Sequence, residues 1–215
     1  LDTEISEYSG FLESMVSDIN LVDSLEDPKL PTNYARGTLT RPNQKDNPLN
    51  AWFWKCNIKG KSSGKLSGKT IVIKDNICVA DVPMMNGSDV FEGLVPDQDA
   101  TVVTRVLDAG GEILGKAVCE NFCFSGGSHT SATGPVKNPH NELYMAGGSS
   151  SGCAALIVAG ECDMGIGSDQ GGSVRMPASF SGCFGLKPTY GLVPYTGASG
   201  IDQSVDHLGP MAANT

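Results

Sequence analysis

Residues 147–177 read GGSSSGCAALIVAGECDMGIGSDQGGSVRMP and decide the fold. The apolar run from Ser151 to Ala159, ended by Gly160, predicts a helix. Met164 to Gly167 is a short apolar run typical of a buried strand, and a second turn rich in Gly and Ser follows it. A helix and a strand in close succession, each bordered by a Gly-rich turn, indicate alternation of the two element types.

The same alternation extends upstream. The β-branched run Thr70 to Ile73 predicts a buried strand, and residues 112–118 predict another. Between them, Asp99 is expected to cap a helix that Gly110 and Gly111 close. The apolar face of this helix comprises Val102, Val103, Val106 and Leu107. Together with a Gly- and Ser-rich loop at 125–135, this order predicts an α/β fold with a parallel or mixed sheet flanked by helices.

The N-terminal segment differs from the rest. Helical spacing of apolar residues over 4–25 predicts one amphipathic helix with a docking face, broken near Asn20. Residues 26–50 are rich in Pro, Asn and charge and predict a surface connection. Trp52 and Trp54 are expected to be core residues. We therefore assign residues 1–60 to an N-terminal helical segment with its connection, and residues 61–215 to the α/β unit.

Composition excludes several classes of protein. The 215 residues carry a formal net charge of −9, which disfavours nucleic acid as a partner. The longest apolar stretch is too short to span a membrane, and the N-terminus shows no export signal. Seven cysteines without a disulfide framework fit reduced thiols, so we expect a cytoplasmic protein. A chain that begins with Leu and ends without a terminal helix suggests a fragment.

No cofactor or metal site is predicted. Cys119 and Cys123 could share a metal, but no histidine or second cysteine pair completes a site, so two core thiols are the favoured interpretation. Gly68-Lys69-Thr70 resembles the end of a phosphate-binding loop, but position 63 is Ser and the strand follows the lysine rather than preceding it.

One alternative for the chemistry stays open. Residues 148–152 match G-x-S-x-G, the nucleophile elbow of α/β hydrolases, with Ser150 at its centre. That mechanism needs an acid and then a histidine downstream, and His207 is the one candidate histidine.

Three pieces point to a different chemistry. Lys74 ends a predicted strand beside apolar neighbours, and burial can lower the pKa of a lysine enough to make it a base. Residues 147–152 place hydroxyls before a helix, where they could equally serve as a cap. Residues 167–175 place two glycines before Ser173, an arrangement that can aim successive N–H groups at an oxyanion or form a plain turn. Each piece alone is ambiguous.

Together these pieces resemble the amidase signature family. The pattern G-G-S-S-S-G-x-x-A followed by D-Q-G-G-S-V-R-M-P matches its signature, and Lys74 lies in the expected I-K-D-N setting. Lys74 precedes Ser149 by 75 residues, and Ser149 precedes Ser173 by 24. The likeness covers residues 65–215, includes G-L-K-P-T-Y-G-L-V-P at 185–194, and is greatest to broad-specificity bacterial amidases.

The resemblance implies a role for each residue. Ser173 is the expected nucleophile, Ser149 the proton relay after a cis Gly148–Ser149 bond, and Lys74 the neutral base. Oxyanion donors are expected from the N–H groups of Gln170, Gly171, Gly172 and Ser173. Asp169 and Arg175 are expected to pair and brace the nucleophile turn.

The expected activity is hydrolysis of a small carboxylic amide. A homo-oligomer is a further expectation. Within the family, the alternative is the glutamine-hydrolysing subunit of a tRNA-dependent amidotransferase. If the chain is not an enzyme, the alternative is a non-catalytic relative. Family domains run to about twice this length, so this chain resembles an N-terminal half, and its open sheet edges predict aggregation.

Overall fold

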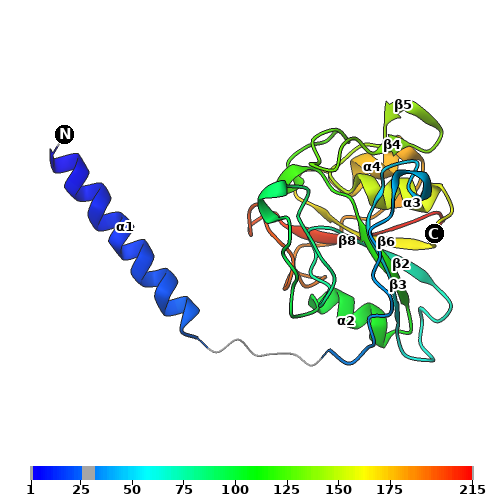
Figure 1. The fold of residues 1–215 in the computed structure, drawn as a ribbon, viewed down its shortest axis with the longest axis horizontal. Coiled ribbons are helices and arrows are strands. Elements are labelled where there is room, and N and C mark those ends of the chain that lie inside the picture. The colour runs from blue at the N-terminus through cyan, green and yellow to red at the C-terminus, as the bar shows by residue number, and fades with distance from the viewer. Residues whose placement is uncertain (1, 26–31, 215) are drawn as a thin grey trace. The chain divides into compact units, whose positions relative to one another are not determined.

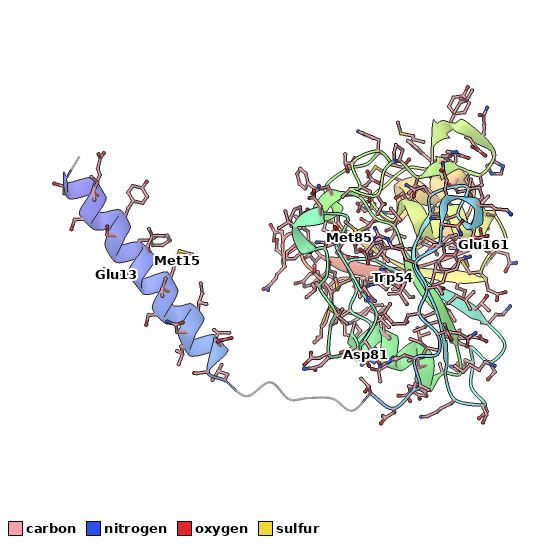
Figure 2. The ribbon with its side chains drawn as sticks, viewed as in Figure 1. Glu13, Met15, Trp54, Asp81, Met85 and Glu161 are labelled. Atoms are coloured by element: carbon pink, nitrogen blue, oxygen red, sulfur yellow. The ribbon has the colours of Figure 1, made fainter. Side chains whose placement is uncertain are left out.

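The structure is a computed structural model that describes residues 2–25 and 32–214. Contacts divide the chain into two units, Leu1–Pro31 and Thr32–Thr215. The first unit contains α1 (Asp2–Asp23), a continuous helix, so the predicted break near Asn20 is wrong. Its described side chains, Glu13 and Met15 among them, are exposed (Figure 2). No helix among the described residues is long and apolar enough to cross a membrane.

The second unit is built on a mixed sheet of six strands (Figure 1). Their order across the sheet is β1 (Trp52–Lys59), β3 (Glu112–Ala117), β2 (Thr70–Lys74), β6 (Met164–Asp169), β8 (His207–Ala212) and β7 (Phe184–Gly185). The central strand β2 runs parallel to β3 and β6, and the other pairings are antiparallel. A separate ribbon pairs β4 (Lys137–Asn138) with β5 (Asn141–Met145). The predicted α/β class with a mixed sheet is confirmed.

Helices cover both faces of this sheet. Val72 of β2 packs in a core cluster with α3 (Ser151–Val158) and α4 (Arg175–Ser181), whereas its neighbours Ile71 and Ile73 pack in a second cluster with α2 (Thr101–Asp108). This alternation follows from the two-residue period of a strand. Figure 1 shows α2 on one side of the strands and α3 and α4 on the other. Three short 3-10 turns complete the unit: Gln44–Asp46, Asp89–Phe91 and Asn121–Cys123.

Two local expectations need correction. Asp99 does not cap α2; Ala100 holds the N-cap position, and the Asp99 carboxylate accepts hydrogen bonds from Ala80 N (2.9 Å) and from the Arg36 guanidinium (2.7 Å). The Asp99 side chain therefore connects two loops and does not cap the helix.

Strand β1 was missed. It places Trp52 in the core and Trp54 at its border, and Thr40 forms a β-bridge to Lys55. Residues 32–59 therefore belong with the sheet by contact. Assignment of 1–60 and 61–215 as domains of a longer protein stays a prediction.

Candidate active site

Lys74 is the last residue of the central strand and is fully buried. Its Nζ lies 2.7 Å from Ser149 Oγ, 2.8 Å from Ser168 Oγ and 3.4 Å from Ser168 O. The position follows from the sheet, since β2 is enclosed by parallel neighbours and its end opens onto the turns that follow β6 and precede α3. The amine is thus surrounded by hydroxyl and carbonyl oxygens.

Ser149 lies in the turn that leads into α3. Its side chain is fully buried, and the preceding Gly148–Ser149 bond is cis, as the family resemblance implied. Its carbonyl accepts a hydrogen bond from Glu120 N at 3.3 Å. Gly148 leaves no room for a side chain, because a Cβ there would lie 1.9 Å from Gly127 O. The backbone on both sides of the relay serine is therefore held closely.

Ser173 lies in the turn between β6 and α4. Its carbonyl accepts a hydrogen bond from Ser150 N at 3.1 Å, which ties the two serine-rich turns together. Its side chain is 6% exposed and lines a cavity of about 280 Å³ with Gln170, Gly171 and Cys123. Within the described residues no hydrogen bond joins the Ser149 and Ser173 hydroxyls. Catalytic hydrogen bonds are often long before substrate binds.

Asp169 and Arg175 form a two-point ion pair. Arg175 Nε and Nη2 donate to Asp169 Oδ2 and Oδ1 at 3.0 and 2.9 Å. The same carboxylate accepts the N–H groups of Gly172 (2.7 Å) and Val174 (3.1 Å), the residues on either side of Ser173. Burial alone raises the pKa of Asp169, but the hydrogen bonds from Arg175, Val174 and Gly172 outweigh it and hold the pKa below its ordinary value.

This contact alters the set of candidate oxyanion donors. Gly172 N–H is engaged by Asp169, so the expectation that it points at a substrate is wrong. In the part of the chain that the structure describes, the N–H groups of Gln170, Gly171 and Ser173 have no hydrogen-bond partner. Asp side chains often accept hydrogen bonds from backbone N–H groups a few residues further along, a sequence signal that could have shown this.

Sequence reasoning missed the contact of the lysine with Ser168 and the hydrogen bond by which Asn76 holds that serine. Ser168 Oγ contacts Lys74 and also accepts a hydrogen bond from Asn76 Nδ2 at 3.2 Å. Asn76 Nδ2 also donates to Ser199 O at 3.1 Å. Neither Ser168 nor Asn76 stands out in the chain, because their meeting depends on the pairing of β2 with β6.

The structure does not assemble the elbow alternative. Ser150 Oγ donates to Ser168 O at 3.3 Å, deep in the core. His207 lies in β8, with its ring nitrogens at Val205 O and Lys187 Nζ. The two residues therefore have separate partners.

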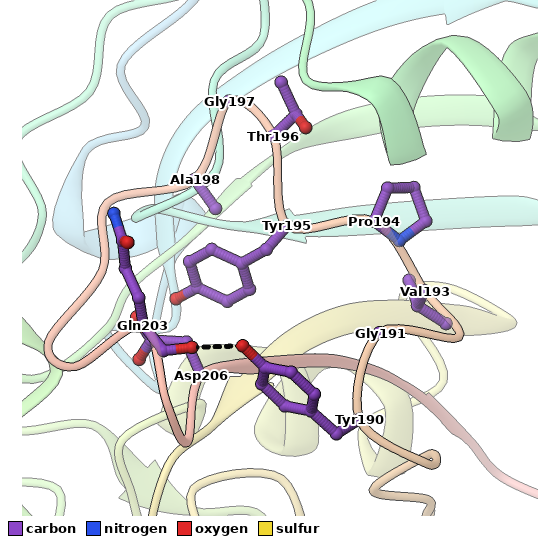
Figure 3. A pocket seen from close by; sticks show the side chains of 10 residues that line it. All are labelled: Tyr190, Gly191, Val193, Pro194, Tyr195, Thr196, Gly197, Ala198, Gln203 and Asp206. Atoms are coloured by element: carbon purple, nitrogen blue, oxygen red, sulfur yellow. Dashed lines mark hydrogen bonds between the residues drawn. The ribbon is translucent and has the colours of Figure 1, made fainter.

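Two further observations bear on ligands. Among the described residues no group of three or more His, Cys, Asp or Glu side chains could hold a metal ion. A second cavity of about 440 Å³ is lined by Tyr190, Gly191 and residues 193–198, with Gln203 and Asp206 (Figure 3). It contains none of the predicted catalytic residues, and it is linked to the first cavity through the hydrogen bond from Gln170 Nε2 to Tyr195 Oη at 3.0 Å.

The fold and the site together define an α/β protein of the amidase-signature class, with a buried lysine set against two serine-rich turns. The sequence profile of the family described as Amidase matches residues 50–215, and this chain belongs to that family.

Comparison with known proteins agrees. An enantioselective amidase of Rhodococcus rhodochrous is 53% identical over 174 residues, 80% of this chain and 33% of that protein. The Glutamyl-tRNA(Gln) amidotransferase of Halobacterium salinarum has a subunit that is 44% identical over 76% of this chain and 39% of its own length. The native peptide amidase of Stenotrophomonas maltophilia superposes with a TM-score of 0.66 at 37% identity, covering 70% of this chain and 32% of that one. The chain thus spans about a third of the length of these relatives.

Proposed function

We propose that this chain carries the catalytic residues of an amidase that cleaves a carboxylic amide through a Ser173 acyl-enzyme. The observation that supports this most directly is the 2.7 Å contact between Lys74 Nζ and Ser149 Oγ in a dry site beside the Ser173 turn. Amide hydrolysis needs a proton acceptor for the attacking hydroxyl and a proton donor for the leaving amine. A neutral Lys74 linked through Ser149 supplies both.

The steps follow from these positions. Ser173 Oγ attacks the carbonyl carbon while its proton moves to Ser149 and the Ser149 proton moves to Lys74. The free N–H groups of Gln170, Gly171 and Ser173 are the candidate donors to the oxyanion; loss of one such donor costs about 3–4 kcal/mol of barrier. The proton then returns to the leaving nitrogen, and water cleaves the ester, giving a carboxylate and ammonia or an amine.

The test is labelling of the full-length protein with a fluorophosphonate, which reports an activated serine. We expect Ser173→Ala to abolish labelling and Lys74→Met to lower its rate by at least about 100-fold, the low end for a lost general base. His207→Ala is the matched control and should label like the parent. Labelling that survives Lys74→Met but not His207→Ala would replace this proposal with the elbow mechanism.

A second function stays open within the family, since the relatives include an amidotransferase component. Offering benzamide, propionamide and glutamine separates the two. Ammonia from glutamine alone, and only with a partner protein present, would favour the amidotransferase. A small amide as substrate, a cytoplasmic location and a homo-oligomeric state stay predictions.

A further inference from the structure

Cys123 lies in the same cavity as Ser173 but has no part in the proposed hydrolysis. It ends the 3-10 turn Asn121–Cys123, where Phe122 and Cys123 adopt φ values of 47° and 59°. Left-handed backbone at two successive residues other than glycine is costly and clusters at functional sites. The turn holds the thiol against the candidate catalytic residues.

A second thiol accompanies it. The sulfurs of Cys119 and Cys123 lie 4.0 and 3.4 Å from the same atom, Asn86 Oδ1. Both are free thiols. The Cys123 sulfur also interacts with Lys74 and with Ser168. The two sulfurs therefore lie around one oxygen atom, and the Cys123 residue also lines the cavity that contains Ser173.

The two thiols differ in reactivity. Burial alone raises the pKa of Cys123, but hydrogen bonds from Cys119, Lys74 and Ser168 and the charge of Lys74 lower it to about 6. Burial raises the pKa of Cys119, and it raises the pKa of Cys56 and Cys153 to about 12 and of Cys183 to about 11. Burial also raises the pKa of Cys78 and Cys162. Of the seven cysteines, Cys123 alone combines thiolate character with a place on a cavity wall.

We propose that Cys123 is an oxidation site for hydroperoxides that enter the candidate substrate cavity, with Cys119 as its resolving thiol. The Cys123 thiolate attacks one oxygen of hydrogen peroxide, forming an S–O bond and breaking the O–O bond; the released hydroxide takes a proton and leaves as water. The Cys119 sulfur then attacks the sulfenic sulfur. An S–S bond forms, the S–O bond breaks, and the hydroxyl leaves with the Cys119 proton as a second water. The two thiols lose two electrons, and the peroxide gains them.

The same proton links this reaction to hydrolysis. A thiol beside a neutral amine and a thiolate beside an ammonium differ only in which of the two groups holds one proton. Peroxide reacts with the thiolate form, and the proposed amidase chemistry uses the neutral amine. The disulfide removes the thiol from Lys74 and reshapes the cavity wall, so we expect hydrolysis to fall on oxidation. This last expectation rests on the proposed function; the oxidation itself does not.

The experiment treats the full-length protein with hydrogen peroxide at pH 7 and follows each cysteine by peptide mass spectrometry. At that pH a pKa of about 6 gives about 90 times more thiolate than an ordinary pKa of 9. Limited access and lower intrinsic nucleophilicity reduce this advantage. We expect Cys123 to be oxidised at least about 10-fold faster than Cys153 or Cys162, and a Cys119–Cys123 disulfide that dithiothreitol reverses.

Two variants make the test specific. Cys119→Ser should stop at the sulfenic acid, which dimedone traps on Cys123, whereas Cys153→Ser, the matched control from the same core, should behave like the parent. Circular dichroism verifies that each variant is folded. Oxidation of Cys123 no faster than that of Cys153, or a Cys119→Ser variant with no dimedone adduct, would overturn the proposal. Mass and adduct are read without any amidase assay, so failure of the proposed function leaves this result interpretable.

Discussion

Replacing Asp169 by Asn should loosen the turn that carries Ser173. The loss of stability should exceed that caused by removing Arg175, the half-exposed partner of this carboxylate. The carboxylate is fully buried and accepts hydrogen bonds on both oxygens. Asn keeps an oxygen at Oδ1 for Gly172 N, but its NH2 group then faces Val174 N and Arg175 Nε, which are donors. A buried donor without an acceptor costs about 1–3 kcal/mol, and the lost charge-assisted bond from Arg175 adds about 1 kcal/mol because that guanidinium is half exposed. We expect the free energy of unfolding to fall by about 2–4 kcal/mol.

The assay is urea unfolding at pH 7, combined with the rate of fluorophosphonate labelling. Arg175→Ala is the matched control: it removes the exposed partner and leaves both backbone contacts, so its loss should stay near 1 kcal/mol. The labelling rate should fall at least about 10-fold in Asp169→Asn, because Val174 N loses its hydrogen bond to Asp169 Oδ2 and the turn at Ser173 is held less firmly. If both variants lose the same stability, or if Asp169→Asn unfolds like the parent, the carboxylate does not organise the turn.

Three other predictions concern the same unit. The pKa of Asp169 is lower in the folded state than in the unfolded state. The ionised carboxylate therefore stabilises the fold above the unfolded pKa of about 3.9, and this stabilisation is lost as pH falls through the folded pKa. In urea titrations below about pH 4, the difference in unfolding free energy between the parent and Asp169→Asn should narrow. Gly152→Ala should lower the free energy of unfolding by about 3 kcal/mol or more, because its Cβ would lie 2.5 Å from Ala51 O and 2.6 Å from Val118 N. In Gly171→Ala the added Cβ meets nothing within 4 Å, so this control should unfold like the parent. Equal urea midpoints for the two variants would refute the packing argument. Ser168→Ala removes one hydroxyl from Lys74 and should slow labelling about 5-fold, the equivalent of about 1 kcal/mol, with no change expected in Ser204→Ala at the exposed surface.

Elements with unbroken apolar runs could be predicted from the sequence. Strands β2 and β6 and helix α3 are buried nearly throughout, and their composition shows it. Strand β1 was missed because Lys55 and Asn57 interrupt its apolar residues, and β8 because Gly209 and Pro210 obscure it. Both strands owe their existence to partners distant in the chain, which local pattern does not reveal.

The candidate site divides along the same line. Lys74, Ser149 and Ser173 were selected because their spacing resembles a family signature, and the structure places Lys74 against Ser149 and the Ser173 turn beside them. The contact of Ser168 with the lysine depends on the pairing of β6 with β2, and the place of Cys123 near the lysine depends on the path of the chain after β3. No spacing rule connects residue 123 to residue 74, so only the folded backbone could bring them together.

Burial alone would not select the base, since the sheet holds two fully buried lysines. Lys116 lies on β3 opposite Ile73, which directs it to the other face of the sheet, and there it donates to Ile77 O at 2.6 Å and pairs with Asp75 at 3.4 Å. A buried amine needs polar partners, and Lys116 has a carboxylate and a carbonyl beside it. Lys74 instead contacts two hydroxyls and a carbonyl, and no carboxylate is among its hydrogen-bond partners in the described part of the chain. This difference in partners, rather than in exposure, supports the choice of Lys74 as the base of the proposed mechanism.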